Sequence, residues 1–130
     1  MRQLLSQLGY DLGTEEVEQR YHAVACAEGH ATIVAERDGR VAAFLHVFAR
    51  PAFEKPTEAV VQALVVDVTC RGEGIGKLLM AAAEAWALER GLPSIALSTN
   101  TSRAAAHAFY HALGYDRQAT SHLLRKRLRA

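Results

Sequence analysis

The sequence has few cysteines, prolines and aromatic residues and no strong excess of charge: 2 Cys, 3 Pro, 7% aromatic residues and a formal net charge of +1 in 130 residues. Cys26 and Cys70 provide neither a disulfide framework nor paired metal-ligand spacing, which fits a reducing compartment. No apolar run approaches the roughly 20 residues of a membrane span or forms a secretion signal. We therefore expect a cytoplasmic protein that does not bind a membrane. The near-neutral charge excludes a general attraction to nucleic acid.

The chain is expected to form one domain, residues 1–130, because 50% hydrophobic residues suffice for a single core. Helical spacing occurs at Leu4–Leu8, from Thr14 as N-cap to Glu28, from Ile75 to the Gly91 and Pro93 stop signals, and at Ser102–Leu113. Strand patterns occupy Ala31–Glu36, Val41–Phe48, Ala59–Val66 and Ser94–Thr99, with two short strands expected between Tyr115 and Leu128. This alternation predicts an α/β fold with a mixed sheet.

Three local patterns add detail to this prediction. Asp38-Gly39 between two strand patterns predicts a tight hairpin. The segment Ala59–Val66 is apolar except at Gln62, which predicts a central strand buried on both faces. The third helix is expected to lay an apolar stripe on the sheet, formed by Ile75, Leu78, Leu79, Ala82 and Trp86.

Residues 71–77, Arg-Gly-Glu-Gly-Ile-Gly-Lys, lie between the predicted central strand Ala59–Val66 and the third helix, whose pattern begins inside them. Glycines let backbone N–H groups approach a ligand, and a helix N-terminus carries unpaired N–H groups and partial positive charge. The segment therefore predicts a phosphate or diphosphate site. A P-loop is excluded, because only three residues separate Gly72 from Gly76 and Leu78 follows Lys77. The dinucleotide fingerprint is excluded because the third Gly comes one residue early.

What the loop does match is Arg-x-x-Gly-x-Gly after an apolar strand. Together with Phe109-Tyr110-His111-Ala112-Leu113-Gly114-Tyr115 it resembles the GNAT superfamily of N-acetyltransferases over residues 57–115. The resemblance implies a three-layer α/β fold with a mixed, mostly antiparallel sheet flanked by helices. It also implies direct transfer of acetyl from acetyl-CoA to a primary amine of a small molecule or protein, without a metal. The superfamily's usual first strand is missing here, which leaves a shorter sheet, a late start or a homodimer partner covering the edge.

The same resemblance implies the residues of the coenzyme site. Backbone groups of the central strand would hold the pantetheine arm, and the glycine loop would hold the diphosphate: Leu64, Val65, Val66, Arg71, Gly72, Glu73, Gly74, Ile75, Gly76 and Lys77. Tyr110 would protonate the departing thiolate, since a phenol keeps its proton at neutral pH. The competing interpretation of Tyr110 is a core aromatic residue beside Phe109.

The sequence departs from the superfamily at two places. Gln62 stands where many relatives carry a Glu base, so the base is either a water held by Gln62 or His46, which titrates in the useful range. A structural role for His46 also remains open. The Asn that reaches the pantetheine corresponds to Arg103 by position or to Asn100 by type, and Asn100 can equally be a helix cap.

Other reactive residues favour ordinary structural roles. Cys70 is interpreted as a loop residue rather than a reactive thiol. The pair His107 and His111 is interpreted as a solvated helix face rather than a metal site, and the basic tail Arg125–Arg129 as the charged face of an edge strand.

Two competing functions stay open, a catalytically silent acyl-CoA-binding sensor or subunit and an unrelated nucleotide-binding domain. The acceptor would be shaped by Gly9–Thr14 and Ala119–His122, with Asp11 as a candidate partner for a cationic amine; neither segment selects one amine.

Overall fold

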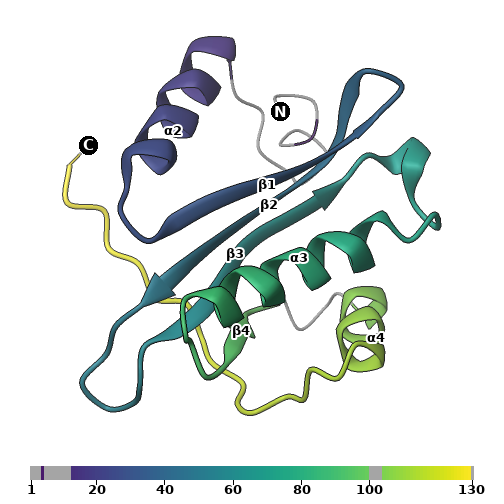
Figure 1. Ribbon diagram of the computed structural model, residues 1–130. Coiled ribbons are helices and arrows are strands. Elements are labelled where there is room, and N and C mark those ends of the chain that lie inside the picture. Colours follow the sequence, from purple (N-terminus) through teal and green to yellow (C-terminus); the bar gives the residue numbers. More distant parts are fainter. Residues whose placement is uncertain (1–3, 5–12, 100–103, 130) are drawn as a thin grey trace. The chain divides into compact units, whose positions relative to one another are not determined.

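Four strands form one mixed sheet in the order β1-β2-β3-β4. The computed structural model describes residue 4, residues 13–99 and residues 104–129. These fall into two compact units, Met1–Ser98 and Thr99–Ala130. The first unit holds α2 (Thr14–Cys26), β1 (His30–Arg37), β2 (Arg40–Arg50), β3 (Glu58–Val66), a 3-10 turn (Val68–Cys70), α3 (Ile75–Glu89) and β4 (Ile95–Leu97). Figure 1 shows α2 leading into β1 and α3 running along the sheet beside β3.

The strands β1 and β2 form the hairpin that the Asp-Gly signal predicts. Only Asp38 and Gly39 separate them, with φ of 54° and 76°. Positive φ at both turn residues is the geometry whose twist matches that of the flanking strands, and Asp-Gly adopts it readily. The hairpin prediction is confirmed, and the last strand pair before the turn is Arg37 with Arg40.

Two irregularities of register shape the sheet. Ala35 pairs with Ala43 and Glu36 with Val41, so Ala42 is an extra residue in β2. His46 pairs with Ala63 and Val47 with Val61, so Gln62 is an extra residue in β3. An extra residue of this kind changes which face the following side chains occupy.

The core is centred on β2 and on the helix that packs against it. Ala43, Leu45 and Val47 are fully buried. Helix α3 packs on β1, β2 and β3, and its buried residues are Leu79, Met80, Ala83 and Ala87. A small cluster on the sheet joins Leu4, Phe44 and Val65.

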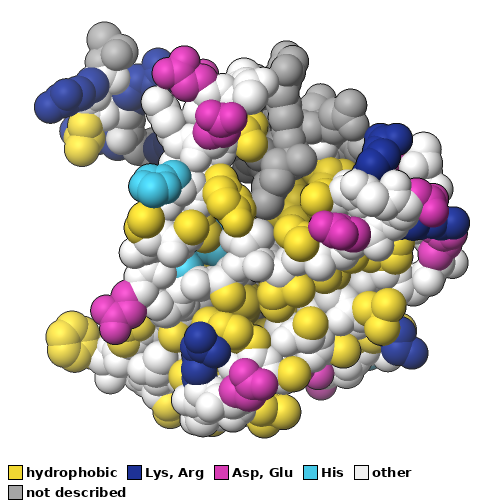
Figure 2. All heavy atoms as spheres, turned by 45° about the horizontal axis from the view of Figure 1, so that its top comes forward, with side chains coloured by type: hydrophobic (Ala, Val, Ile, Leu, Met, Phe, Trp, Pro, Cys, Tyr) yellow, Lys and Arg dark blue, Asp and Glu magenta, His cyan; other side chains and the backbone are white. Residues whose placement is uncertain are grey.

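The predicted apolar stripe of α3 is partly wrong. Leu79 is buried, but Leu78 is 70% exposed and Met80 and Ala83 are buried in its stead. The buried residues Leu79, Met80, Ala83 and Ala87 still repeat at helical spacing, but the buried stripe lies one residue further along the helix than predicted. Apolar side chains accordingly reach the surface, and Figure 2 shows them across much of one face, with charged side chains mostly around them.

The predicted element ends need several corrections. Gly13 precedes α2 as its N-cap and Thr14 is its first residue, while Ala27, in an extended conformation, ends the helix before Glu28. The strand expected at Ser94–Thr99 is only Ile95–Leu97. No strand occurs in the described tail residues 115–129, where two were expected. Of the expected helix Leu4–Leu8 only Leu4 is described; the predicted start of the last helix at Ser102 also lies outside the described residues.

The second unit contains α4 (Ala104–Ala112) and the tail. The helix ends at Ala112 and is followed by Gly114, whose φ is 96°. The Tyr115 N–H donates to the Tyr110 carbonyl at 3.0 Å and the Gly114 N–H to the His111 carbonyl at 3.0 Å. This pair of bonds around a left-handed glycine is a Schellman cap. The Leu-Gly-Tyr sequence therefore has a local structural reason as a helix stop.

Candidate active site

The segment between β3 and α3 has the geometry of an anion-binding loop. Gly72 and Gly74 adopt φ of 83° and 81°, which only glycine adopts without strain. Gly74 is the N-cap of α3 and supplies no side-chain cap, and its carbonyl accepts the first helical bond from the Leu78 N–H at 3.1 Å. The N–H groups of Ile75, Gly76 and Lys77 therefore belong to the first helical turn, where the helix provides no acceptor.

The space in front of these glycines is open. A Cβ built on Gly72 or on Gly74 meets no atom within 4 Å. A diphosphate carries two negative charges and several acceptor oxygens, and it needs room beside backbone N–H groups. The open space and the backbone of the loop are compatible with such a group.

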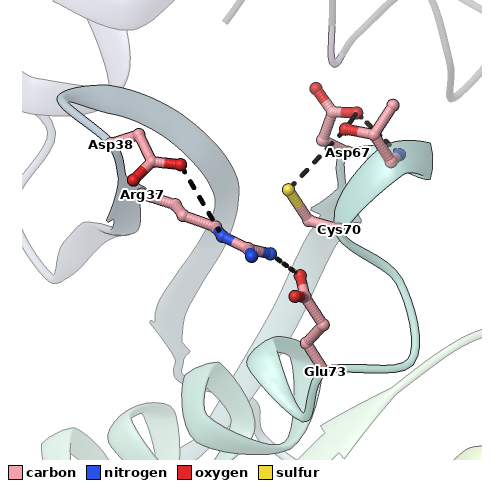
Figure 3. Close-up of polar contacts among 6 residues, drawn as sticks. Arg37, Asp38, Asp67, Cys70 and Glu73 are labelled. Carbon is pink, nitrogen blue, oxygen red and sulfur yellow. Dashed lines mark hydrogen bonds and ion pairs between the residues drawn. The ribbon is translucent and has the colours of Figure 1, made fainter.

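Charged side chains surround this loop. The Arg71 Nε donates to the Val66 carbonyl at 3.3 Å, which fixes the side chain along the end of β3 while it stays exposed. The Glu73 carboxylate pairs with the guanidinium of Arg37, from the end of β1 (Figure 3). This pairing with Glu73 is the main cause that raises the pKa of Arg37 above its ordinary value.

The 3-10 turn before the loop is held by its own acid. Asp67 accepts hydrogen bonds from the Thr69 N–H at 2.9 Å and from the Thr69 hydroxyl at 2.8 Å. The thiol of Cys70 lies next, 3.7 Å from the Thr69 hydroxyl (Figure 3). These local bonds fix how the chain leaves β3 and enters the glycine loop.

Strand β3 separates from β4 before the loop is reached. The parallel pairing joins only Ala59–Val61 to Ile95–Leu97, whereas β3 continues to Val66. The extra residue Gln62 lies where the pairing stops, and its side chain is exposed, so the prediction of a strand buried on both faces is wrong there. A bulged residue is left out of the ladder of paired residues, and it bends the strand locally. Gln62 and the backbone of Leu64–Val66 thus lie on the part of β3 that has no pairing with β4.

His46 lies on β2 beside this bulge, paired with Ala63. Its Nε2 is 2.9 Å from the Nδ1 of His30, and the His30 ring stacks on Phe48 with centroids 4.9 Å apart. Burial, and secondly the charge of His30, lower the pKa of His46 below its ordinary 6.5. Neutral His46 is thereby favoured near pH 7, which a general base requires.

The other predicted residues divide into two groups. Tyr110 is half-buried in the second unit, with ring centroids 5.0 Å from Phe109 and 6.0 Å from Tyr115, a geometry compatible with either role considered for it. Asn100 and Arg103 lie outside the described residues. The structure thus brings Gln62, Leu64–Val66 and the loop together, with His46 on the neighbouring strand.

Two residues of interest escaped the sequence interpretation, His30 and Arg37. No motif contains either of them, and each acts through a partner far away in sequence, His46 or Glu73. Only the strand register would have revealed the first pair, and no spacing rule links the second.

The described parts of the chain hold no group of three His, Cys, Asp or Glu side chains that could bind a metal ion. His107 bonds to the Thr99 hydroxyl at 2.9 Å, and the His111 Nδ1 lies 3.9 Å from Asp116. None of the helices described is long and apolar enough to cross a membrane.

Comparison with known proteins identifies N-acetyltransferases among the similar sequences. The chain is 29% identical over 107 residues to an uncharacterized N-acetyltransferase, YhdJ, of Bacillus subtilis, covering 82% of this chain and 75% of that protein. It is 26% identical over 106 residues to an aminoglycoside N(6')-acetyltransferase type 1 of Stenotrophomonas maltophilia, covering 78% of this chain and 69% of that protein.

The solved structures show the fold. The aminoglycoside N-acetyltransferase AAC(6')-Iy in complex with CoA superposes with a TM-score of 0.87 at 22% identity, covering 97% of this chain and 86% of that one. The same enzyme has been solved with the bisubstrate analog CoA-S-monomethyl-acetylneamine. The predicted mixed, mostly antiparallel sheet is confirmed, with β1, β2 and β3 antiparallel and β4 parallel to β3. A sequence model of the acetyltransferase (GNAT) family matches residues 1–115, and the chain belongs to that family.

Proposed function

We propose that the protein is a cytoplasmic N-acetyltransferase that moves the acetyl group of acetyl-CoA directly to a primary amine. The observation that carries this proposal is the open, left-handed glycine loop at the N-terminus of α3, which follows the edge of β3 left by β4. The family membership supports the reaction class, and relatives named for aminoglycoside acetylation support a small cationic amine as acceptor.

The coenzyme would lie along this edge and loop. The diphosphate would accept hydrogen bonds from backbone N–H groups of the segment Arg71–Lys77. The pantetheine arm would pair with the backbone of Leu64, Val65 and Val66 in the way that an added strand pairs with a sheet edge. Asn100 or Arg103 would reach the same arm. The assignments on β3 and the glycine loop require backbone groups rather than particular side chains, which suits a segment composed mostly of glycine and apolar residues.

The transfer needs a neutral amine and a proton for the sulfur. The amine nitrogen attacks the thioester carbonyl carbon, the bond between that carbon and sulfur breaks, and one amine proton passes to a base. We assign the base to His46, held by His30, or to a water ordered by Gln62; Tyr110 gives its phenol proton to the departing thiolate. His46 suits the task because its lowered pKa keeps it unprotonated near neutral pH.

Titration calorimetry with acetyl-CoA tests the proposal first. We expect micromolar binding, and release of free thiol when a panel of primary amines is added to the wild type. In Tyr110→Phe we expect the turnover number to fall while coenzyme affinity stays the same. Absence of acetyl-CoA binding by folded protein would refute the proposal, whereas binding without turnover of any amine would favour the catalytically silent sensor or subunit.

A single domain and a homodimer stay predictions of the sequence. Analytical ultracentrifugation tests the second: a dimer would agree with a partner covering the outer edge of β1, and a monomer at micromolar concentration would contradict it.

A further inference from the structure

We propose that Arg37 is a positioning residue of the coenzyme site, which holds the Glu73 carboxylate away from the diphosphate and cancels its charge. This inference rests on the proposed function and extends it to the β1–β2 hairpin. It concerns a residue that no loop motif contains and that lies 36 positions before its partner.

Glu73 presents a physical problem for an anion site. It lies between Gly72 and Gly74, the two left-handed residues of the loop, so its backbone is part of the proposed diphosphate cradle. A free carboxylate there would repel each negative charge of the ligand. An acidic side chain is therefore compatible with this position only if its charge is compensated.

The guanidinium of Arg37 compensates the charge of the Glu73 carboxylate. Arg37 is the last residue of β1 and is fixed by its pairing with Arg40 beside the tight turn. Its guanidinium reaches across to the Glu73 carboxylate, with Asp38 on its other side at 4.0 Å (Figure 3). Asp38 lies near Nε of Arg37, whereas the terminal NH1 group pairs with Glu73. The terminal part of the guanidinium therefore interacts with the loop through Glu73.

A role in stability alone does not account for this pair. Both side chains are partly exposed, 47% for Arg37 and 39% for Glu73. Ion pairs at such exposure contribute little to folding, because water screens them and ordering two long side chains opposes them. Their effect on a nearby dianion is larger, since removing Arg37 would leave an uncompensated charge beside the ligand.

Arg50 offers a matched control. It is 46% exposed and pairs with Glu58 at 3.0 Å, at the other end of β2. Replacing Arg37 at the end of β1 or Arg50 at the end of β2 by glutamine removes one positive charge of similar exposure and one ion pair with a glutamate, although Glu58 also pairs with Lys55. Only Arg37 has its partner in the glycine loop.

The test measures acetyl-CoA affinity by calorimetry in Arg37→Gln, Glu73→Gln, the double variant and Arg50→Gln, at 50 mM and 500 mM salt. We expect Arg37→Gln to weaken binding about tenfold at low salt and much less at high salt. Glu73→Gln should tighten binding, and the double variant should return to within about threefold of the wild type, because the repelling charge is gone. Arg50→Gln should bind as the wild type does.

A second measurement separates charge from shape. The KM for S-acetylpantetheine, which has no diphosphate, should be the same in Arg37→Gln and the wild type. Equal affinities of Arg37→Gln and Arg50→Gln for acetyl-CoA would overturn the inference. A loss that persists in the double variant would overturn it too, and would mean that Arg37 contacts the coenzyme itself. If the wild type binds no acetyl-CoA, the proposed function fails, and this inference fails with it.

Discussion

Replacement of Gly74 by aspartate or asparagine should separate the charge of the proposed coenzyme site from its shape. Gly74 has φ 81° and ψ 9°, a left-handed conformation, and a Cβ there meets no atom within 4 Å. Asparagine and aspartate both tolerate this conformation better than most residues, so each should cost about 1 kcal/mol of folding free energy. The two variants have nearly the same size and differ by one negative charge.

The expected difference in affinity follows from Coulomb's law. With two diphosphate charges about 6 Å from the new carboxylate, the repulsion is about 1.4 kcal/mol at the dielectric constant of water and about 5.5 kcal/mol at an effective value of 20. Because the loop is exposed, its effective dielectric constant lies nearer to that of water. We therefore expect Gly74→Asp to bind acetyl-CoA about 30-fold more weakly than Gly74→Asn, which corresponds to about 2 kcal/mol.

Calorimetry at two salt concentrations, with circular dichroism to check folding, measures this difference. The gap between the variants should shrink at 500 mM salt, because screening weakens the repulsion. Equal affinities of two folded variants at low salt would refute the placement of the diphosphate at the N-terminus of α3.

The remaining predictions concern pH and stability. The pKa of His46 is lowered, so its contribution to stability is complete above pH 6.5 and is lost as pH falls through the folded value; His46→Gln should flatten the dependence of Tm on pH below 6.5. The pKa of Glu58 is lowered by Lys55 above all, so its contribution is present above pH 4.5 and is lost as pH falls further; Glu58→Gln should remove that acid sensitivity in urea titrations at pH 3–6. Leu45→Ala, at a position that is 0% exposed, should lower the free energy of unfolding by about 3 kcal/mol, and Leu88→Ala, at 75% exposed, by less than about 0.5 kcal/mol. A small effect at Leu45 or a large one at Leu88 would contradict the core described above.

Local signals predicted the parts of the fold that depend on nearby residues. The Asp38-Gly39 turn, the strand that contains Gln62 and the Gly91 stop of α3 each depend on a short stretch of chain, and the structure has each of them. The glycine loop was predictable for the same reason, since positive φ at Gly72 and Gly74 is a backbone requirement that only glycine meets easily.

Register was the part that no local signal could supply. A regular ladder counted from the hairpin turn would place His30 opposite Val47 and on the other face of the sheet from His46. The extra residue Ala42 shifts the pairing, so His30 pairs with Phe48 and shares a face with His46. His30 was missed because its contact with His46 depends on this shift of register. Arg37 was missed because its contact with Glu73 depends on how the hairpin approaches the loop.

The hairpin therefore contacts the segment proposed to bind the coenzyme, or its neighbour on β2, at two places. At one end His30 contacts His46, next to the bulge at Gln62, and at the other end Arg37 contacts Glu73 in the loop. Both contacts are made by side chains of β1, whose backbone pairs only with β2 in the described sheet. Because β1 contributes no residue to the glycine motif, its effect on catalysis would pass through charge and proton affinity rather than through direct contact with acetyl-CoA. A substitution in β1 that leaves the fold intact should then change pH and salt dependence before it changes the binding of uncharged parts of the substrate.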